Sequence, residues 1–154
     1  TVLVRSPDKL PAVLRQRITV IQGDGLVLDD VARALPRGTD AVLFAVGVDE
    51  KTSPPDLCTD VTRHILAVMR TAQILRLVWC GGGSNFRLLD ENTDLCWLGV
   101  RPLQMKSGPK RGYYRLGYNA FSGLSTISFA DCAHAMLTML DDDTWIGKVP
   151  IIQY

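Results

Sequence analysis

The sequence has little that would mark a membrane protein or a nucleic-acid-binding protein. Its 154 residues contain no apolar run near the roughly 18–20 residues that a membrane-spanning helix needs. The formal net charge is only +1, which gives no general attraction to nucleic acid or to an anionic bilayer. We therefore expect no nucleic-acid partner and no membrane partner.

Signatures of metal binding are missing as well. The cysteines Cys58, Cys80, Cys96 and Cys132 are far apart, form no Cys-x-x-Cys pair and have no nearby pair of histidines. We predict no metal site. Cys80 and Cys96 lie in strand-like runs and Cys132 in a helix-like run, so we expect buried free thiols, with redox sensing or pairing as the alternative. This use of cysteine fits a reducing, cytoplasmic location.

Short apolar runs alternate with helix-like stretches along the chain. Runs that are continuously apolar suit the strands of a parallel sheet covered on both faces. The predicted strands are residues 1–4, 18–22, 41–47, 76–80 and 95–100, and the predicted helices are residues 28–35, 56–72 and 86–90. This alternation predicts an α/β fold, a Rossmann-like doubly wound parallel sheet in three layers.

The last third of the chain changes character. We expect a short strand at residues 113–116, an amphipathic helix at 128–140 and a final edge strand at 149–153. We predict that residues 1–154 form a single domain of this fold, and that residues 101–154 form its substrate side.

Two parts of such a fold have no counterpart in the sequence. The strand at residues 1–4 matches the second strand of a sheet with order 3-2-1-4-5-6, so the first strand and its Gly-rich loop are absent. Without that strand, buried backbone groups would stay unpaired, at a cost of roughly 1–3 kcal/mol each. We expect upstream residues to fill the gap; the alternative is direct pairing of the second and fourth strands. We also expect a missing segment between Asn85 and Phe86, because residues 86–94 are short for a parallel crossover.

Several short motifs, taken in order, resemble one known family. They are residues 2–11, 23–24, 38–42, 47, 53–54, 60–63, 81–84, 101–102, 112–117 and 127–131. Together they are similar to the NAD(P)H-binding, NmrA-like group of atypical short-chain dehydrogenases, near the flavin reductase and biliverdin-IXβ reductase proteins. The family's GxxGxxG loop is not in the sequence, and neither is a Tyr-x-x-x-Lys dyad. Members of this group often lack the dyad, so its absence does not exclude reductase activity.

The resemblance implies how the adenosine end of a cofactor is recognised. Arg5 follows the predicted second strand, where this fold contacts the adenosine ribose. An arginine there accommodates the 2′-phosphate of NADP(H), whereas an acidic residue would favour NAD(H). Ser6 and Lys9 add to this predicted phosphate site. The alternative is a solvated arginine at a strand end.

Further predicted cofactor-binding residues follow the later strands: Asp24, Gly47, Val48, Gly82 and Gly83. Asp24 has an alternative interpretation as a turn aspartate that bonds its own backbone. The alternative interpretation of Gly47 is a turn glycine with positive φ.

The predicted substrate-binding residues are Ser84, Arg101 and Pro102, with structural roles as the alternative. Ser84 is the one catalytic candidate, as a hydrogen-bond donor, because no base is apparent that would make it a nucleophile. Both histidines are interpreted as structural, and Asp131 as serving the start of its helix.

The implied function is that of an NADP(H)-dependent oxidoreductase, with NAD(H) also possible. It would transfer a hydride to a small organic acceptor such as a flavin, a quinone or a carbonyl compound. We expect a small-molecule substrate and a monomer or homodimer. Two alternatives stay open: a non-catalytic NmrA-like sensor of cofactor redox state, and a truncated, inactive remnant.

Overall fold

The structure is a computed structural model that describes residues 1–48, 51–81, 86–92, 94–118 and 125–154. Its contacts cluster in two compact units, described here one at a time. Unit 1 comprises residues 1–40 and 48–74, and unit 2 comprises residues 41–47 and 75–154. A single domain over residues 1–154 stays a prediction. Within the described ranges, no helix is long and apolar enough to cross a membrane.

Unit 1 holds a two-stranded parallel sheet and two packed helices. Its elements are β1 (Val2–Val4), the 3-10 helix η1 (Pro7–Lys9), α1 (Ala12–Arg15), β2 (Val20–Gln22), α2 (Leu28–Ala34) and α3 (Leu57–Ala72). β1 pairs with β2 in parallel, and α2 contacts both strands and packs on α3. The predicted helical spacing in α3 is confirmed, because Val61, Ile65, Val68 and Met69 are all buried. α3 ends at Gln73, which takes a left-handed φ of 61°.

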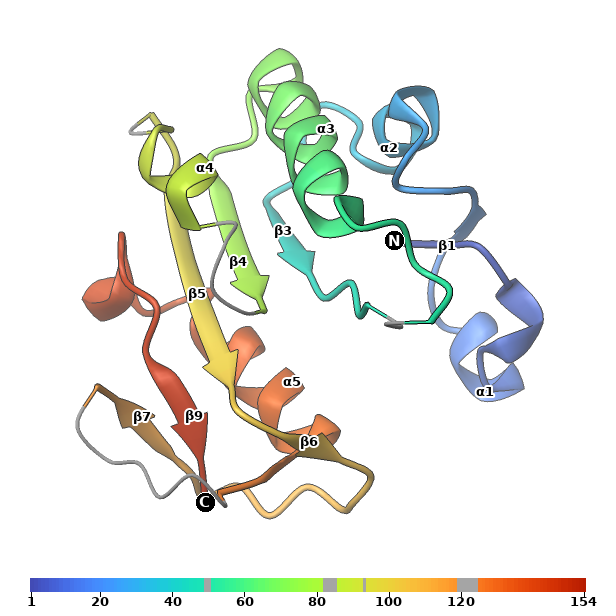
Figure 1. Ribbon diagram of the computed structural model, residues 1–154. Coiled ribbons are helices and arrows are strands. Elements are labelled where there is room, and N and C mark those ends of the chain that lie inside the picture. The colour runs from blue at the N-terminus through green and yellow to red at the C-terminus, as the bar shows by residue number, and fades with distance from the viewer. Residues whose placement is uncertain (49–50, 82–85, 93, 119–124) are drawn as a thin grey trace. The chain divides into compact units, whose positions relative to one another are not determined.

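Unit 2 holds a five-stranded sheet with the order β3-β4-β5-β9-β7 (Figure 1). Its elements are β3 (Ala41–Phe44), β4 (Arg76–Cys80), α4 (Phe86–Asp90), β5 (Cys96–Pro102), β6 (Met105–Lys106), β7 (Arg115–Gly117), β8 (Ile127–Ser128), α5 (Phe129–Thr138), the 3-10 helix η3 (Asp143–Trp145) and β9 (Ile151–Gln153). The first four strands of that order are parallel and β7 is antiparallel to β9. β6 and β8 form a separate parallel pair.

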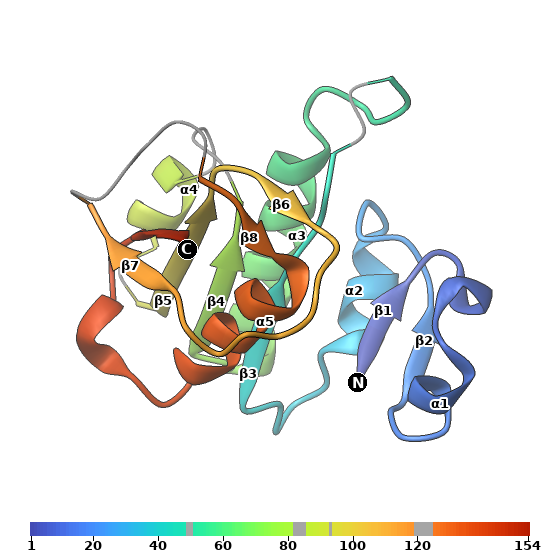
Figure 2. The same cartoon turned by 90° about the horizontal axis from the view of Figure 1, so that it is seen from below.

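Helices cover both faces of the sheet in unit 2. On one face, Cys132, Ala135 and Met136 of α5 join a buried cluster with β4 and β5, and Figure 2 shows α5 lying over these strands. On the other face, Trp79 meets the ring of Phe86 on α4 edge-on, with the ring centroids 4.9 Å apart. The predicted Rossmann-like α/β fold with a mostly parallel sheet is confirmed.

Three details of the predicted topology have definite outcomes. The prediction of a final edge strand is wrong: β9 lies between β5 and β7, and Ile152 and Gln153 are each only 1% exposed. Direct pairing of the second and fourth strands is not what the described residues show, since β1 and β3 belong to different sheets. The predicted interruption between Asn85 and Phe86 falls on a position outside the described residues.

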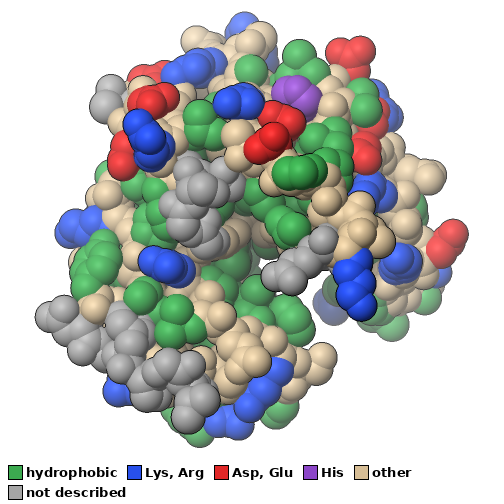
Figure 3. Space-filling model, in the orientation of Figure 1, with side chains coloured by type: hydrophobic (Ala, Val, Ile, Leu, Met, Phe, Trp, Pro, Cys, Tyr) green, Lys and Arg blue, Asp and Glu red, His purple; other side chains and the backbone are tan. Residues whose placement is uncertain are grey.

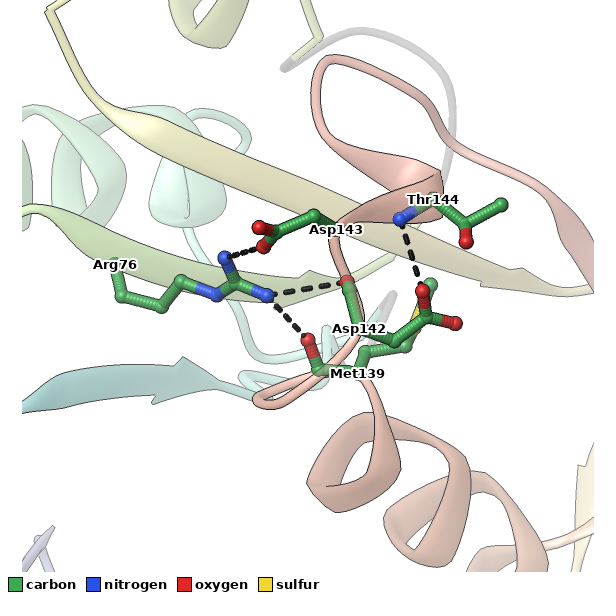
Figure 4. Close-up of polar contacts among 5 residues, drawn as sticks. All are labelled: Arg76, Met139, Asp142, Asp143 and Thr144. Atoms are coloured by element: carbon green, nitrogen blue, oxygen red, sulfur yellow. Dashed lines mark hydrogen bonds and ion pairs between the residues drawn. The ribbon is translucent and has the colours of Figure 1, made fainter.

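Arg76 ties the end of α5 to the start of β4 (Figure 4). Its Nη2 donates to the carbonyls of Met139 at 2.8 Å and Asp142 at 3.1 Å, while Nη1 lies 2.5 Å from the Asp143 carboxylate. The Arg76 side chain is 16% exposed, and the carboxylate of Asp142 accepts from the backbone N–H of Thr144. Carbonyls at a helix end have no partner within the helix, so Arg76 satisfies groups that the fold would otherwise leave unpaired.

We expect Arg76→Ala to lower the free energy of unfolding by about 2–4 kcal/mol, because two shielded carbonyls lose their donor. The ion pair with the exposed Asp143 adds little to this. Arg76→Lys should recover part of the loss, and Arg87→Ala, on the exposed side of α4, should stay within about 0.5 kcal/mol of the wild type. Urea unfolding followed by circular dichroism measures all three. An Arg76→Ala protein as stable as the Arg87→Ala protein would contradict this role.

Candidate functional site

The carboxyl ends of three strands in unit 2 form one edge of the sheet. Because β3, β4 and β5 are parallel, Phe44, Cys80 and Pro102 end them at the same edge. Ligands of doubly wound sheets bind at this edge. Gly47, a predicted cofactor position, follows β3, and Gly81 follows β4. The predicted residues Gly82, Gly83 and Ser84 lie outside the described residues.

The two described glycines of this edge differ in the space that a side chain would find there. A Cβ on Gly81 would lie 2.5 Å from the ring of Trp79, which is buried, so packing alone requires glycine there. A Cβ on Gly47 would meet no heavy atom within 4 Å. Gly47 is also absent from the described glycines with positive φ, which rules out the turn alternative. Packing against the described residues therefore does not account for Gly47.

Substitution by alanine should therefore affect stability at one of these glycines and not at the other. Gly81→Ala should lower the free energy of unfolding by about 1–3 kcal/mol, since Trp79 must move out of a filled core. Gly47→Ala should leave stability within about 0.5 kcal/mol of the wild type. Thermal unfolding of the two variants side by side measures the difference, and equal losses would contradict the account.

Arg101 and Pro102 lie where the sequence predicts, at the end of β5. Both take part in pairing with β9, and the backbone N–H of Arg101 donates to the carbonyl of Pro150. The Arg101 side chain is exposed and has no hydrogen bond or ion pair among the described residues. The substrate-binding roles of both residues stay predictions, and the guanidinium of Arg101 is not engaged by the described residues.

Arg101 is the first of several basic residues in a segment of unit 2 that has no acidic residue. Residues 95–130 contain five basic residues and no Asp or Glu: Arg101, Lys106, Lys110, Arg111 and Arg115. All five are exposed. Figure 3 shows Lys and Arg side chains, with no acidic neighbours in view, at the lower end of the molecule where β6 and β7 lie. Two of them have contacts within unit 2, since Arg115 donates to the carbonyl of Tyr154 and Arg111 lies over the Tyr154 ring.

Gln153 is a polar residue at the same edge that the sequence analysis missed. β9 is parallel to β5, so its last residue lies toward the carboxyl edge. The side chain is buried, yet neither its amide oxygen nor its amide nitrogen has a hydrogen-bond partner among the described residues. Buried amides are almost always paired, so the expected partner of this amide is a group that the described residues do not supply.

In unit 1, three predicted cofactor residues gather after β1. Arg5, Ser6 and Lys9 are all exposed, and Arg5 directly follows the strand. The Ser6 hydroxyl does not cap η1, and the side chains of Arg5 and Lys9 have no hydrogen bond or ion pair among the described residues. The result is a set of two cations and one hydroxyl at a strand end, with all donors available.

Asp24 makes the backbone contact of a turn aspartate, which was the alternative interpretation, and its cofactor role stays a prediction. Its Oδ1 accepts from the backbone N–H of Leu26 at 3.0 Å, and its own N–H donates to the carboxylate of Asp30. Arg33 pairs with the same carboxylate, and these contacts lower the pKa of Asp30. Val48 is 54% exposed in unit 1 and has no described contact that assigns it a role.

The most highly connected polar group in unit 2 is Asp131. Its carboxylate is fully buried and accepts from the backbone N–H groups of Arg111 and Gly112 and from the hydroxyls of Ser128 and Tyr154. Burial alone would raise the pKa of Asp131, but the hydrogen bonds outweigh it and hold the pKa well below its usual range. Asp131 serves the start of α5 as predicted, and it also anchors the loop before β7, which the sequence did not indicate.

The histidines have defined partners in separate units. His64 Nδ1 lies 2.9 Å from the carbonyl oxygen of Gly25 in unit 1. His134 Nδ1 lies 3.1 Å from the Tyr114 hydroxyl in unit 2. Each is half-buried and held by one contact, which agrees with a structural interpretation but does not test catalysis.

Solved structures of other proteins share this fold. A Rossmann-fold NAD(P)-binding family protein from Shigella flexneri matches with a TM-score of 0.77 at 18% identity, over 98% of this chain and 78% of that one. A short-chain dehydrogenase/reductase from Veillonella parvula, solved with NADP, matches with a TM-score of 0.77 at 13% identity, over 99% and 81%. An oxidoreductase from Lactococcus lactis matches with a TM-score of 0.75 at 14% identity, over 98% and 77%.

These likenesses establish the fold, and the sequence itself establishes the family. The family model described as NAD(P)H-binding matches residues 1–87. That range holds β1 with Arg5, Ser6 and Lys9, as well as β3 and β4 with Gly47 and Gly81. Because the match covers more than half of the 154 residues, the chain belongs to the NAD(P)H-binding family.

Proposed function

We propose that the protein is an NADP(H)-dependent oxidoreductase of the atypical short-chain type. The observation that carries this proposal is the group of exposed, unengaged donors after β1: Arg5, Ser6 and Lys9. It lies in the part of the chain that matches the NAD(P)H-binding family. A phosphate on the adenosine ribose is the part of NADP(H) that NAD(H) lacks, and it is the chemistry that this group suits.

The three side chains differ in what they offer to a phosphate. The guanidinium of Arg5 is planar and donates two parallel hydrogen bonds to phosphate oxygens. Lys9 adds a point charge, and the Ser6 hydroxyl adds a neutral donor. Because all three are exposed, we expect their contribution to weaken with salt. The residues present therefore fit the adenosine-phosphate end of NADP(H).

At the carboxyl edge of unit 2, the protein's residues would position the reacting groups. The nicotinamide supplies the hydride when the cofactor is bound. Gly47 leaves room for a ligand, and the orphaned amide of Gln153 offers a donor and an acceptor to a polar group. Since the sequence has no Tyr-x-x-x-Lys dyad, we assign the proton to solvent or to the acceptor itself.

The charge of residues 95–130 favours an anionic acceptor. Residues 95–130 of unit 2 carry five exposed basic residues and no acidic ones. Among flavins, the phosphate of FMN would be attracted, whereas riboflavin carries no such charge. We therefore expect FMN to be reduced with a lower KM than riboflavin, and the difference to shrink as salt is raised.

Turnover tests this function directly. Loss of NADPH absorbance is followed with FMN, riboflavin, a quinone and a carbonyl compound as acceptors, and again with NADH in place of NADPH. The proposal expects steady turnover, faster with NADPH. Tight NADPH binding without turnover of any acceptor would support the sensor instead, and no binding at all would support the inactive remnant.

A further inference from the structure

Two cysteines from distant parts of the chain meet in the core of unit 2. Cys80 is the last residue of β4 and Cys132 lies in the first half of α5, 52 residues apart in the sequence. Their sulfur atoms are 3.8 Å apart, which is contact distance. Cys80 is 7% exposed and Cys132 is 2% exposed. The other cysteines, Cys58 and Cys96, are half-buried.

The geometry points to a redox site: we propose that Cys80 and Cys132 form a reversible intramolecular disulfide when the protein meets a peroxide. A disulfide needs a sulfur–sulfur distance of about 2.0 Å, so the two atoms must approach by a little under about 2 Å. The neighbours that must accommodate this movement include Ala135, a small side chain in the same buried cluster. This proposal goes beyond the oxidoreductase function and does not depend on it.

The local chemistry distinguishes the two thiols. The S–H of Cys80 can hydrogen-bond to the sulfur of Cys132, and this contact lowers the pKa of the Cys132 thiol although burial opposes it. The same contact and burial raise the pKa of Cys80. The thiolate is the nucleophile, so we assign the first attack on the peroxide to Cys132.

The reaction balances with one equivalent of peroxide. The Cys132 thiolate attacks one oxygen of hydrogen peroxide, the O–O bond breaks and hydroxide leaves, which gives a sulfenic acid on Cys132. The sulfur of Cys80 then attacks the Cys132 sulfur, forms the S–S bond and releases water. Two thiols lose two electrons and two protons, and one peroxide becomes two waters. Because both sulfurs are shielded, we expect the reaction to take minutes to hours.

The cross-link would act at the ligand-binding edge of the sheet. Cys80 immediately precedes Gly81 at the carboxyl end of β4. A covalent bond from this point to α5 closes a long loop in the unfolded chain, so the oxidised form should be more stable than the reduced form. We expect the Tm to rise by about 5 °C or more on oxidation and to return with dithiothreitol.

Mass spectrometry of the folded protein tests this. The protein is treated with hydrogen peroxide, quenched with catalase, denatured and alkylated with N-ethylmaleimide. Trypsin places the four cysteines in separate peptides: residues 52–63, 77–87, 88–106 and 116–148. We expect two maleimides per chain in place of four, and a dithiothreitol-sensitive link between peptides 77–87 and 116–148.

The control is Cys96→Ser, which should keep the link, whereas Cys80→Ser and Cys132→Ser should each abolish it. The wild-type mapping decides the matter even where a variant fails to fold. Four maleimides after prolonged oxidation, a link that involves peptide 52–63 or 88–106, or irreversible sulfinic acid at Cys132 would each overturn the proposal.

Discussion

Replacing Arg5 by glutamate should weaken NADPH binding by about 10–100-fold and leave NADH binding within about threefold of the wild type. Arg5 directly follows β1, and its guanidinium is exposed and unengaged in the described chain. The substitution therefore removes donors to the 2′-phosphate and adds a repelling charge. NADH has no phosphate at that position and should not sense the change. Isothermal titration of each variant with both cofactors measures the two affinities.

The matched control for this prediction is Arg17→Glu. Arg17 is also exposed and lies in unit 1, but it precedes β2. Because β1 and β2 are parallel, Arg17 belongs to the opposite edge of that sheet from Arg5. The net charge changes equally in the two variants, so a general electrostatic effect would weaken NADPH binding in both. Arg5→Lys should fall between wild type and Arg5→Glu, because it keeps the charge and loses the paired donors.

Asp131→Asn is expected to cause the largest loss of stability among the substitutions considered. The carboxylate accepts hydrogen bonds from Arg111, Gly112, Ser128 and Tyr154 while fully buried. An amide in its place would turn an N–H₂ group toward some of these donors. We expect the Tm to fall by at least about 5 °C, with a smaller fall for Tyr154→Phe. Asp90→Asn, on the exposed end of α4, is the control and should change the Tm little.

The ionisation of Asp131 should make the stability of the protein depend on pH. The pKa of Asp131 lies below its usual range in the folded protein, since hydrogen bonds to the ionised form outweigh burial. A group of this kind stabilises the fold fully above its unfolded pKa of about 4, and this contribution is lost as the pH falls below that value. The Tm difference between wild type and Asp131→Asn should therefore be constant from pH 7 to 5 and shrink toward pH 3. A difference that stays constant across this range would contradict the account.

The sequence predicts the larger elements well because their patterns are local. The apolar run at residues 76–80 coincides with β4, and the helical spacing of Val61 and Ile65 lies within α3. The short elements η1, α1, β6 and β8 show no apolar run or period of their own, so the sequence does not predict them. The place of β9 inside the sheet depends on its pairing with β7, and no local pattern encodes such pairing.

Some residues of the candidate site could likewise be predicted from local sequence, whereas others could not. Arg5 and Gly47 were predicted from their positions at the ends of predicted strands, together with the family resemblance; the observed β3 ends earlier, at Phe44. The Ser128-x-x-Asp131 spacing indicates only the local capping contact, whereas the partners Arg111, Gly112 and Tyr154 are 19–23 residues away from Asp131. The orphaned amide of Gln153 likewise follows from burial in three dimensions.

Titration of the wild-type protein with NADPH and with NADH tests the central claim most directly. The account predicts saturable NADPH binding at one site per chain, at least about tenfold tighter than NADH binding, with the advantage reduced at high salt. Equal affinity for the two cofactors would contradict the assigned role of Arg5, Ser6 and Lys9. Failure of both to bind would contradict the proposed function itself.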